Sequence, residues 1–282
     1  MTWFALVTTA VSLTIAASDT EPAGPTVIVV TGAGGAPEYA EQFAAWAERW
    51  ETAAHRGRCE VVRIGTDRPG GVMDRDRLRH ALEEQDAAGD RPLWIVLIGH
   101  GTFDGRAARF NLSGPDVAAA ELKSWLARST RPVAVINCAS ASAPFLTTLS
   151  APNRVVVTAT KSGHEQNFAR FGESLSTTIA DSTADLDKDG QTSLLEAFLV
   201  ASRRTEEFYQ TEGRLPTEHA LLDDNGDGRG IRADWFRGVR PITEAAGASP
   251  DGHRAHQWHL VPSEDERRMP PDLRRRRDEL EL

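Results

Sequence analysis

The sequence predicts an open, doubly wound α/β sheet whose strands are mostly parallel. Short continuous apolar runs, of which Leu93 to Ile98 is the clearest, alternate along the chain with stretches whose apolar residues have helical spacing. A central parallel strand is covered on both faces, so it need not alternate apolar and polar residues. Strict alternation of strand and helix therefore favours three layers, with helices on both faces of one sheet.

The strands are predicted from β-branched or apolar runs bounded by turn residues. The first, Thr26 to Val30, is followed by the loop TGAGGAP. That loop has Gly32 and Gly34, but Pro37 stands where a dinucleotide-binding loop needs its third glycine, so no organic cofactor is expected. The later strands are predicted at Cys59 to Ile64, Leu93 to Ile98, Val133 to Ile136 and Arg154 to Thr158.

Helices are predicted between these strands from amphipathic spacing. Glu38 to Arg56 carries three aromatic residues on one face, which is typical of a helix that packs on a core. The pair Asp104 and Gly105 predicts a small hairpin beside the sheet. Further helices are predicted at Arg75 to Ala88, Val117 to Ala127, Pro144 to Leu149 and from about Phe171.

Composition and charge limit the partners that this chain could have. Its 282 residues can bury a full core, and the net charge of −9 with 26% charged residues is that of an acidic protein. The strongest basic run, Arg274 to Arg277, is balanced by Asp278, Glu279 and Glu281. No nucleic-acid partner is therefore expected.

The N-terminus predicts a secretory signal peptide over residues 1–18. The uncharged run from Trp3 to Ala17 is too short for a comfortable membrane span, and Ala16 to Ser18 could form a cleavage site of small residues. The run lacks an N-terminal Lys or Arg, so an uncleaved anchor or a misplaced start are the alternatives. A cleaved signal would give an extracytoplasmic protein, periplasmic or secreted, with no membrane partner.

Two predicted strands end in side chains that could catalyse a reaction. His100 follows one strand and Cys138 follows the next, and the carboxyl ends of parallel strands border the crevice where such sheets bind ligands. An imidazole lowers the pKa of a neighbouring thiol and later protonates the leaving group. Gly101 permits close approach of a substrate, and its amide could join that of Cys138 in an oxyanion hole. Taken singly, Cys138 would be a buried apolar residue and His100 a turn residue.

The only other cysteine, Cys59, is not expected to form a disulfide with Cys138. Cys59 begins its strand, whereas Cys138 follows its own. In a parallel sheet the two would lie at opposite edges, too far apart for a disulfide.

The order of an apolar strand, then IGHG, then an apolar strand ending in VAVINC resembles the caspase and legumain superfamily of cysteine peptidases, and within it the bacterial legumain-like members. The resemblance covers roughly Thr26 to Ile179. It implies a caspase-like fold, with His100 as general base and acid, Cys138 as nucleophile, and the amides of Gly101 and Cys138 as oxyanion hole. The run from Asn137 to Ser140 departs from the Q-A-C-x-G motif of caspases, so caspase-type specificity for Asp is not expected.

Substrate-binding residues are expected in the loops that follow these strands. Ser140 could line the pocket or only turn the chain, and Ser162 follows the fifth strand. Glu165, in the same loop, could bind a basic substrate side chain. The alternative for all three is an ordinary solvated loop.

An acidic loop after the predicted sheet matches the order of an EF-hand calcium loop, D-x-D-x-D-G-x-x-S-x-x-E. Oxygen atoms at loop positions 1, 3, 5, 7, 9 and 12 converge on one hard cation, and the glycine allows the sharp turn. A second loop satisfies the first half of the pattern and ends in the shorter Asp. The predicted ligands are Asp185, Asp187, Asp189, Gln191, Ser193 and Glu196 in the first loop and Asp223, Asn225, Asp227 and Asp234 in the second.

The chain therefore divides into a signal at 1–18, a peptidase core at 24–180, a helical segment with two acidic loops at 181–240, and a linker with a charged tail at 241–282. The expected function is a cysteine endopeptidase that acts on peptides or proteins through a thioester, with structural Ca²⁺. One alternative is a catalytically inactive caspase-like domain that binds calcium and partners. Another is an acyltransferase that uses the same two residues.

Overall fold

The computed structural model describes residues 24–65, 71–86, 91–242 and 250–281. The predicted signal at 1–18, part of the predicted linker at 243–249, and the predicted end of the second helix at Ala88 lie outside the described residues.

A six-stranded sheet in the order β2-β1-β3-β7-β8-β9 forms the centre of the fold. Its first five strands are parallel, and β9 runs antiparallel to β8. The predicted doubly wound, mostly parallel α/β sheet is thus confirmed, and an antiparallel edge strand is added to it. The strands are β1 (Thr26–Thr31), β2 (Glu60–Ile64), β3 (Leu93–Ile98), β7 (Val133–Asn137), β8 (Arg154–Thr158) and β9 (Leu221–Asp223).

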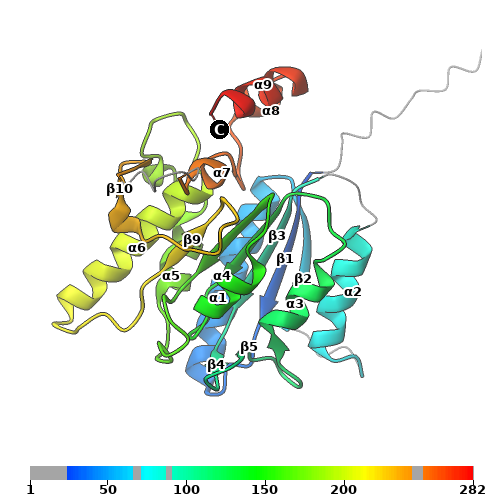
Figure 1. Ribbon diagram of the computed structural model, residues 1–282, viewed down its shortest axis with the longest axis vertical. Helices are drawn as coiled ribbons and strands as arrows, with labels where there is room; N and C mark the ends of the chain where they lie inside the picture. Colours follow the sequence, from blue (N-terminus) through cyan, green and yellow to red (C-terminus); the bar gives the residue numbers. More distant parts are fainter. Residues whose placement is uncertain (1–23, 66–70, 87–90, 243–249, 282) are drawn as a thin grey trace, which may run out of the picture.

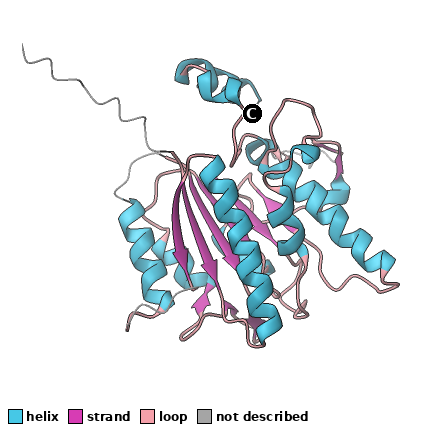
Figure 2. Cartoon of the chain, turned by 180° about the vertical axis from the view of Figure 1, so that it is seen from behind, coloured by secondary structure: helices cyan, strands magenta, loops and turns pink. Residues whose placement is uncertain are grey.

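Helices cover both faces of this sheet (Figures 1 and 2). One face is covered by α1 (Pro37–Arg56), α5 (Phe171–Thr178) and α6 (Leu194–Thr211). The other is covered by α2 (Asp74–Asp86), α3 (Ala119–Trp125) and α4 (Ala143–Leu149). The predicted three layers are present.

Alternate residues of each parallel strand pack into the two helical layers. In β1, Val27 and Val29 face α1, whereas Ile28 and Val30 face the layer of α2 to α4. All four side chains have no exposed surface, which explains why the strand is continuously apolar. The same alternation decides which of the two helical layers each residue at a strand end will face.

A small antiparallel sheet follows β3, where the sequence predicts a hairpin. It consists of β4 (Gly101–Phe103), β5 (Ala108–Phe110) and β6 (Val117–Ala118). The turn between β4 and β5 forms because the Asp104 carboxylate accepts hydrogen bonds from the amides of Arg106 and Ala107.

The second acidic loop follows a β-strand and is followed by the short 3-10 helix η2 (Ala233–Trp235), whereas the sequence predicts a helical segment over 181–240. Leu222 and Ile231 exchange backbone hydrogen bonds that close the loop as a β-bridge, and β9 extends the sheet edge. The chain then continues through short elements: η2 (Ala233–Trp235), β10 (Phe236–Arg237) and β11 (Arg240–Pro241). The single turn η1 (Ser182–Ala184) precedes the first acidic loop.

The C-terminal segment contacts the core at several points. It contains α7 (His253–His256), α8 (Glu264–Arg268) and α9 (Pro271–Glu281), which lie together at one end of the molecule (Figure 1). The ring of Trp258 packs edge-on against Trp94 of β3, with 4.9 Å between centroids. Arg267 donates a hydrogen bond to the carbonyl oxygen of Arg56 at 3.0 Å.

Both cysteines are free, as expected. Among the described residues, no helix is both long enough and apolar enough to cross a membrane.

A buried guanidinium ties three segments together at the amino end of the sheet. Arg131, 3% exposed, donates to the carbonyl and side-chain oxygens of Gln85 at 2.9 and 3.0 Å and to the carbonyl of Pro92 at 3.2 Å. It also donates to the carbonyl of Arg91. The end of α2 and the starts of β3 and β7 therefore share one buried donor.

Replacing Arg131 with Ala should lower the free energy of unfolding by about 2–3 kcal/mol, because it leaves several buried acceptors unpaired. Denaturant titration measures this change. Arg128→Ala, three residues earlier on an exposed site, is the control and should change it by less than about 0.5 kcal/mol. An equal effect of the two substitutions would contradict the role of Arg131.

Candidate active site and acidic loops

The structure brings the two predicted strand ends together. β3 and β7 are neighbours in register, with Leu97 opposite Asn137. The amide of Cys138 donates to the carbonyl of Leu97 at 2.9 Å, which continues the parallel ladder by one residue. Cys138 therefore lies beside Ile98, and His100 lies two residues further along.

His100 is half-buried among aromatic rings on the α1 face of the sheet. Its ring centroid is 5.1 Å from that of Tyr39, 5.0 Å from Phe43 and 6.1 Å from Phe168. Nε2 lies 3.2 Å from the carbonyl oxygen of Gly34, which can only accept, so Nε2 carries a proton. Nδ1 is then the nitrogen that could act as a base.

Cys138 faces the same side of the sheet but is closed off from solvent. It is 1% exposed and belongs to the core cluster of α1, α5 and α6. A Cβ built on Gly172, in the first turn of α5, would come within 2.7 Å of the Cys138 Cβ and 2.9 Å of the Trp46 ring. Only glycine permits this approach, and it seals the thiol beneath α5.

Burial raises the pKa of the Cys138 thiol to about 12, and the negative charge of Glu218 adds to the effect. A cysteine nucleophile needs the opposite shift. In the described part of the chain, no hydrogen bond joins the Cys138 thiol to the His100 ring.

The two amides predicted to form an oxyanion hole already donate within the fold. The amide of Cys138 is used in the strand ladder, and that of Gly101 donates to the Ser140 hydroxyl at 3.2 Å. Gly101 is glycine because a Cβ would come within 2.2 Å of the Ser140 carbonyl oxygen. The sequence suggested that Gly101 lets a substrate approach closely. In the structure, the absence of its side chain instead allows close packing against Ser140.

The predicted substrate-binding residues are also engaged internally. Ser140 is 3% exposed and donates to the Gly101 carbonyl at 3.2 Å. The Ser162 hydroxyl accepts from the amide of His164 at 3.1 Å. Glu165 contacts Nδ1 of His219 at 2.6 Å, so it is not free to bind a basic substrate side chain as predicted.

The contact of Glu165 with His219 was missed in the sequence because the two residues are 54 positions apart. His219 lies in the segment without regular secondary structure that precedes β9. Glu165 also accepts from the amides of His219 and Lys161, which fixes the loop after β8 to this segment.

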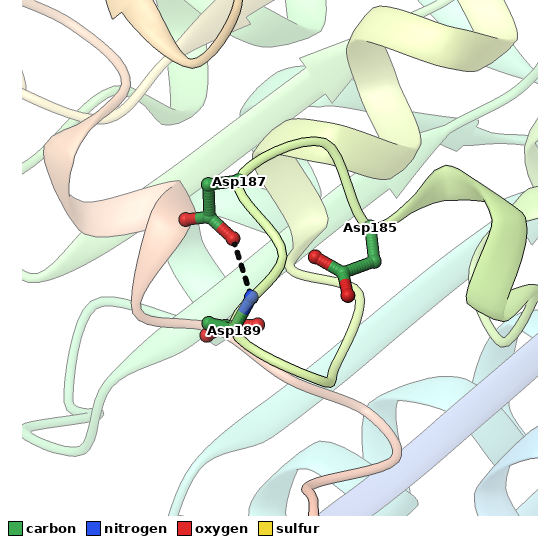
Figure 3. A group of neighbouring side chains, drawn as sticks. All are labelled: Asp185, Asp187 and Asp189. Atoms are coloured by element: carbon green, nitrogen blue, oxygen red, sulfur yellow. Dashed lines mark hydrogen bonds between the residues drawn. The ribbon is translucent and has the colours of Figure 1, made fainter.

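The first acidic loop gathers its carboxylates as predicted. Oxygen atoms of Asp185, Asp187 and Asp189 lie within 4.8 Å of one another, and Asp187 accepts from the amide of Asp189 at 3.1 Å (Figure 3). Gly190 has a φ of +90°, which suits the turn. Glu196 reaches back across the loop and accepts from the amide of Leu186 at 2.6 Å. These oxygen donors fit a hard cation such as Ca²⁺.

Other predicted ligands of this loop have further roles. Ser193 and Glu196 form a capping box at the start of α6. The Gln191 side chain accepts from the amide of Ser263 at 3.0 Å, and its backbone carbonyl is the predicted ligand atom. Asp187 also lies 2.8 Å from Nε2 of His256 in α7, so a cation would share this carboxylate with the histidine.

The second loop is formed only in its first half. Asp223 accepts from the amides of Gly226 and Gly228 at 3.0 Å, and Asn225 accepts from Asp227. Asp234, the predicted last ligand, instead pairs with Arg232 at 2.8 Å. Of the described residues, Asp223, Asp227 and Asp234 do not gather within 4.8 Å of one another.

A pair of buried carboxyls that the sequence did not reveal holds this loop to α7. Asp251 accepts from the amides of Asp224 and Asn225 at 2.9 and 3.2 Å. Asp224 in turn accepts from the amides of Gly252 and Ala255 at 2.9 and 2.7 Å. Burial, together with the charge of Asp224, raises the pKa of Asp251 to about 8. The only sequence signal was an extra Asp beside the loop.

The two thiols provide a direct test of the closed site. At pH 8 neither Cys138 nor Cys59 should react with a thiol reagent in the native protein, because burial also raises the pKa of Cys59 to about 11. Both should react in denaturant. Above pH 9 the unfolded chain releases the Cys138 proton while the native protein retains it to about pH 12, so the free energy of unfolding falls as pH rises through this interval. Rapid native labelling of Cys138, but not of Cys59, would contradict the closed geometry.

Comparison with known proteins gives a fold likeness at low identity. No family model and no curated protein matches the chain. The Drosophila initiator caspase Dronc is similar with a TM-score of 0.44 and 12% identity, over 75% of this chain and 83% of that one. Caspase-1 from Spodoptera frugiperda is similar with a TM-score of 0.46 and 7% identity, over 72% of this chain and 86% of that one. Raptor from Chaetomium thermophilum is similar with a TM-score of 0.37 and 12% identity, over 55% of this chain and only 17% of that one. At these values the activity has to be argued from the site itself.

Proposed function

We propose that this chain is a catalytically silent caspase-like domain that binds calcium and interacts with partners. The observation that carries the proposal is the burial of the Cys138 thiol beneath Gly172 and Trp46. A thiol without solvent contact and with a raised pKa supplies almost no thiolate and has no room for a peptide bond beside it.

The strand register supports the same conclusion. Cys138 lies beside Ile98, so at a rise of about 3.3 Å per residue it sits about 6–7 Å behind His100 along the sheet. If Asn137 is matched to the Gln of Q-A-C-x-G, Cys138 falls on the Ala of that motif and Ala139 on its Cys. Ala139 packs in the opposite layer, among residues of α2 to α4.

A cysteine endopeptidase is the second candidate, because His100 and Cys138 project from adjacent strand ends on one face of the sheet. In that case His100 would act as base and acid and Cys138 as nucleophile, through a thioester. The first turn of α5 would have to leave Cys138 before a substrate could enter.

The two candidates differ in their reaction with an electrophile. A peptidyl acyloxymethyl ketone should leave Cys138 unlabelled, and a peptide library should remain uncut, because the thiol is neither exposed nor ionised. Intact-protein mass spectrometry measures the labelling. Label that is present in wild type and in Cys59→Ala but absent from Cys138→Ala would overturn the silent assignment and favour the peptidase.

We also propose that the first acidic loop is the main calcium site, and that the second, with its displaced Asp234, binds more weakly. Asp185, Asp187, Asp189, Ser193, Glu196 and the carbonyl of Gln191 would hold the ion. Calcium would stiffen the junction between the loop and α6. We also propose an extracytoplasmic location, on the basis of the predicted signal peptide.

Calcium should raise the melting temperature relative to a chelator by several degrees, since binding to the native state at about 100 times Kd adds about 2.7 kcal/mol. Asp187→Asn should remove most of the shift and Asp227→Asn less. Glu264→Gln, on an exposed turn of α8, is the control and should keep it. Equal melting in calcium and chelator would show that the loops bind no calcium.

A further inference from the structure

A cavity of about 410 Å³ lies between α6 and the segment that follows it, and neither His100 nor Cys138 lines it. Its lining includes His219, which contacts the predicted substrate-binding residue Glu165 at 2.6 Å. Its size falls within the range of small-molecule sites. The lining includes the aromatic residues Phe171, Tyr209 and Phe236, together with Leu186, which is 38% exposed.

One side chain in this lining is a buried carboxylate that forms no ion pair with any residue that the structure describes. Glu218 is 4% exposed, and its Oε1 accepts from the amide of Arg170 at 2.8 Å and the Tyr209 hydroxyl at 2.9 Å. From the described residues, Oε2 accepts one hydrogen bond, from the amide of Phe171 at 2.9 Å. A carboxylate offers about four acceptor positions, so Oε2 retains one.

Against the effect of burial, the positive charge of Arg170 lowers the pKa of Glu218, but the guanidinium makes its contacts elsewhere. Arg170 stacks over the ring of Phe208 at 4.1 Å and pairs with Glu173 at 3.7 Å. Within the described ranges, no Lys, Arg or His lies within 4.0 Å of the Glu218 carboxylate. Burial raises the pKa of Glu218, which is the cost of leaving a carboxylate unpaired in a site of low polarity.

The other charges of the lining leave the cavity negative. Arg232 pairs with Asp234 at 2.8 Å, and Arg203 pairs with Glu207 at 3.5 Å. Glu206 is exposed and accepts a hydrogen bond from the side chain of Gln210 at 3.3 Å. Among the described lining residues, the carboxylates of Glu218 and Glu206 therefore have no ion-pair partner within 4.0 Å.

We propose that this cavity is a binding site for an organic cation, an ammonium or guanidinium group on an apolar body, with Glu218 as the ion-pairing residue. The cationic group would donate to Oε2 of Glu218, and the faces of Phe171, Tyr209 and Phe236 would surround the apolar body and attract the positive charge. A free amine and the side chain of a peptide share this chemistry. The proposal concerns a site apart from Cys138 and does not depend on the silent assignment.

Calorimetric titration of the full chain with 2-phenylethylammonium and with neutral 2-phenylethanol, which has the same shape, tests the site. The ammonium should bind at least about tenfold more tightly than the alcohol. Glu218→Gln should remove that preference. Glu206→Gln, at an exposed position, should lower the affinity for the ammonium by less than about threefold. An N-acetylated lysine amide that binds like the ammonium would favour a peptide as the natural source.

Ala233→Lys keeps Glu218 and places a competing cation at the half-buried lining. This variant should also bind 2-phenylethylammonium about tenfold more weakly, so the test remains valid if Glu218→Gln fails to fold. Equal affinity of wild type for ammonium and alcohol would overturn the proposal. So would unchanged binding in Ala233→Lys or in folded Glu218→Gln, or no ammonium binding up to about 10 mM.

Discussion

The approach of α5 to the sheet through Gly172 is the contact on which the rest of this face depends. Because Gly172 has no side chain, the first turn of α5 reaches both Cys138 and the Trp46 ring. Glu218 accepts from the amides of Arg170 and Phe171 and thereby holds the start of the same helix. The closed state of the thiol, the packing of α6 on α5 and the shape of the α6 cavity all follow from where this turn sits.

The sheet and the meeting of two strand ends could be predicted from the sequence, because both are encoded locally. Apolar runs indicate the strands and alternation with helices indicates that they are parallel, so the residues that follow β3 and β7 were expected at the same end of the sheet. The closure of the site could not be predicted in this way. It depends on Gly172, which lies in another element and has no side chain that could indicate a contact.

The acidic loops show the same division. The spacing of Asp185, Asp187 and Asp189 predicts their convergence, since all three belong to one short turn. The pairing of Asp224 with Asp251 and the contact of Asp187 with His256 span 27 and 69 residues. Such contacts form only when the chain returns, and a carboxylate in the sequence does not say whether a backbone amide, a histidine or a metal will meet it.

The contact of Trp258 with Trp94 has a consequence for how the protein is made. Trp94 belongs to β3, near the centre of the sheet, and is 1% exposed in the finished fold. Its cover comes from a residue synthesised 164 positions later. While the ribosome is still extending the chain, the amino end of the sheet keeps an apolar indole uncovered, and late coverage of this kind favours aggregation of incomplete chains. A truncated translation product that ended before α7 would carry the same exposed surface permanently.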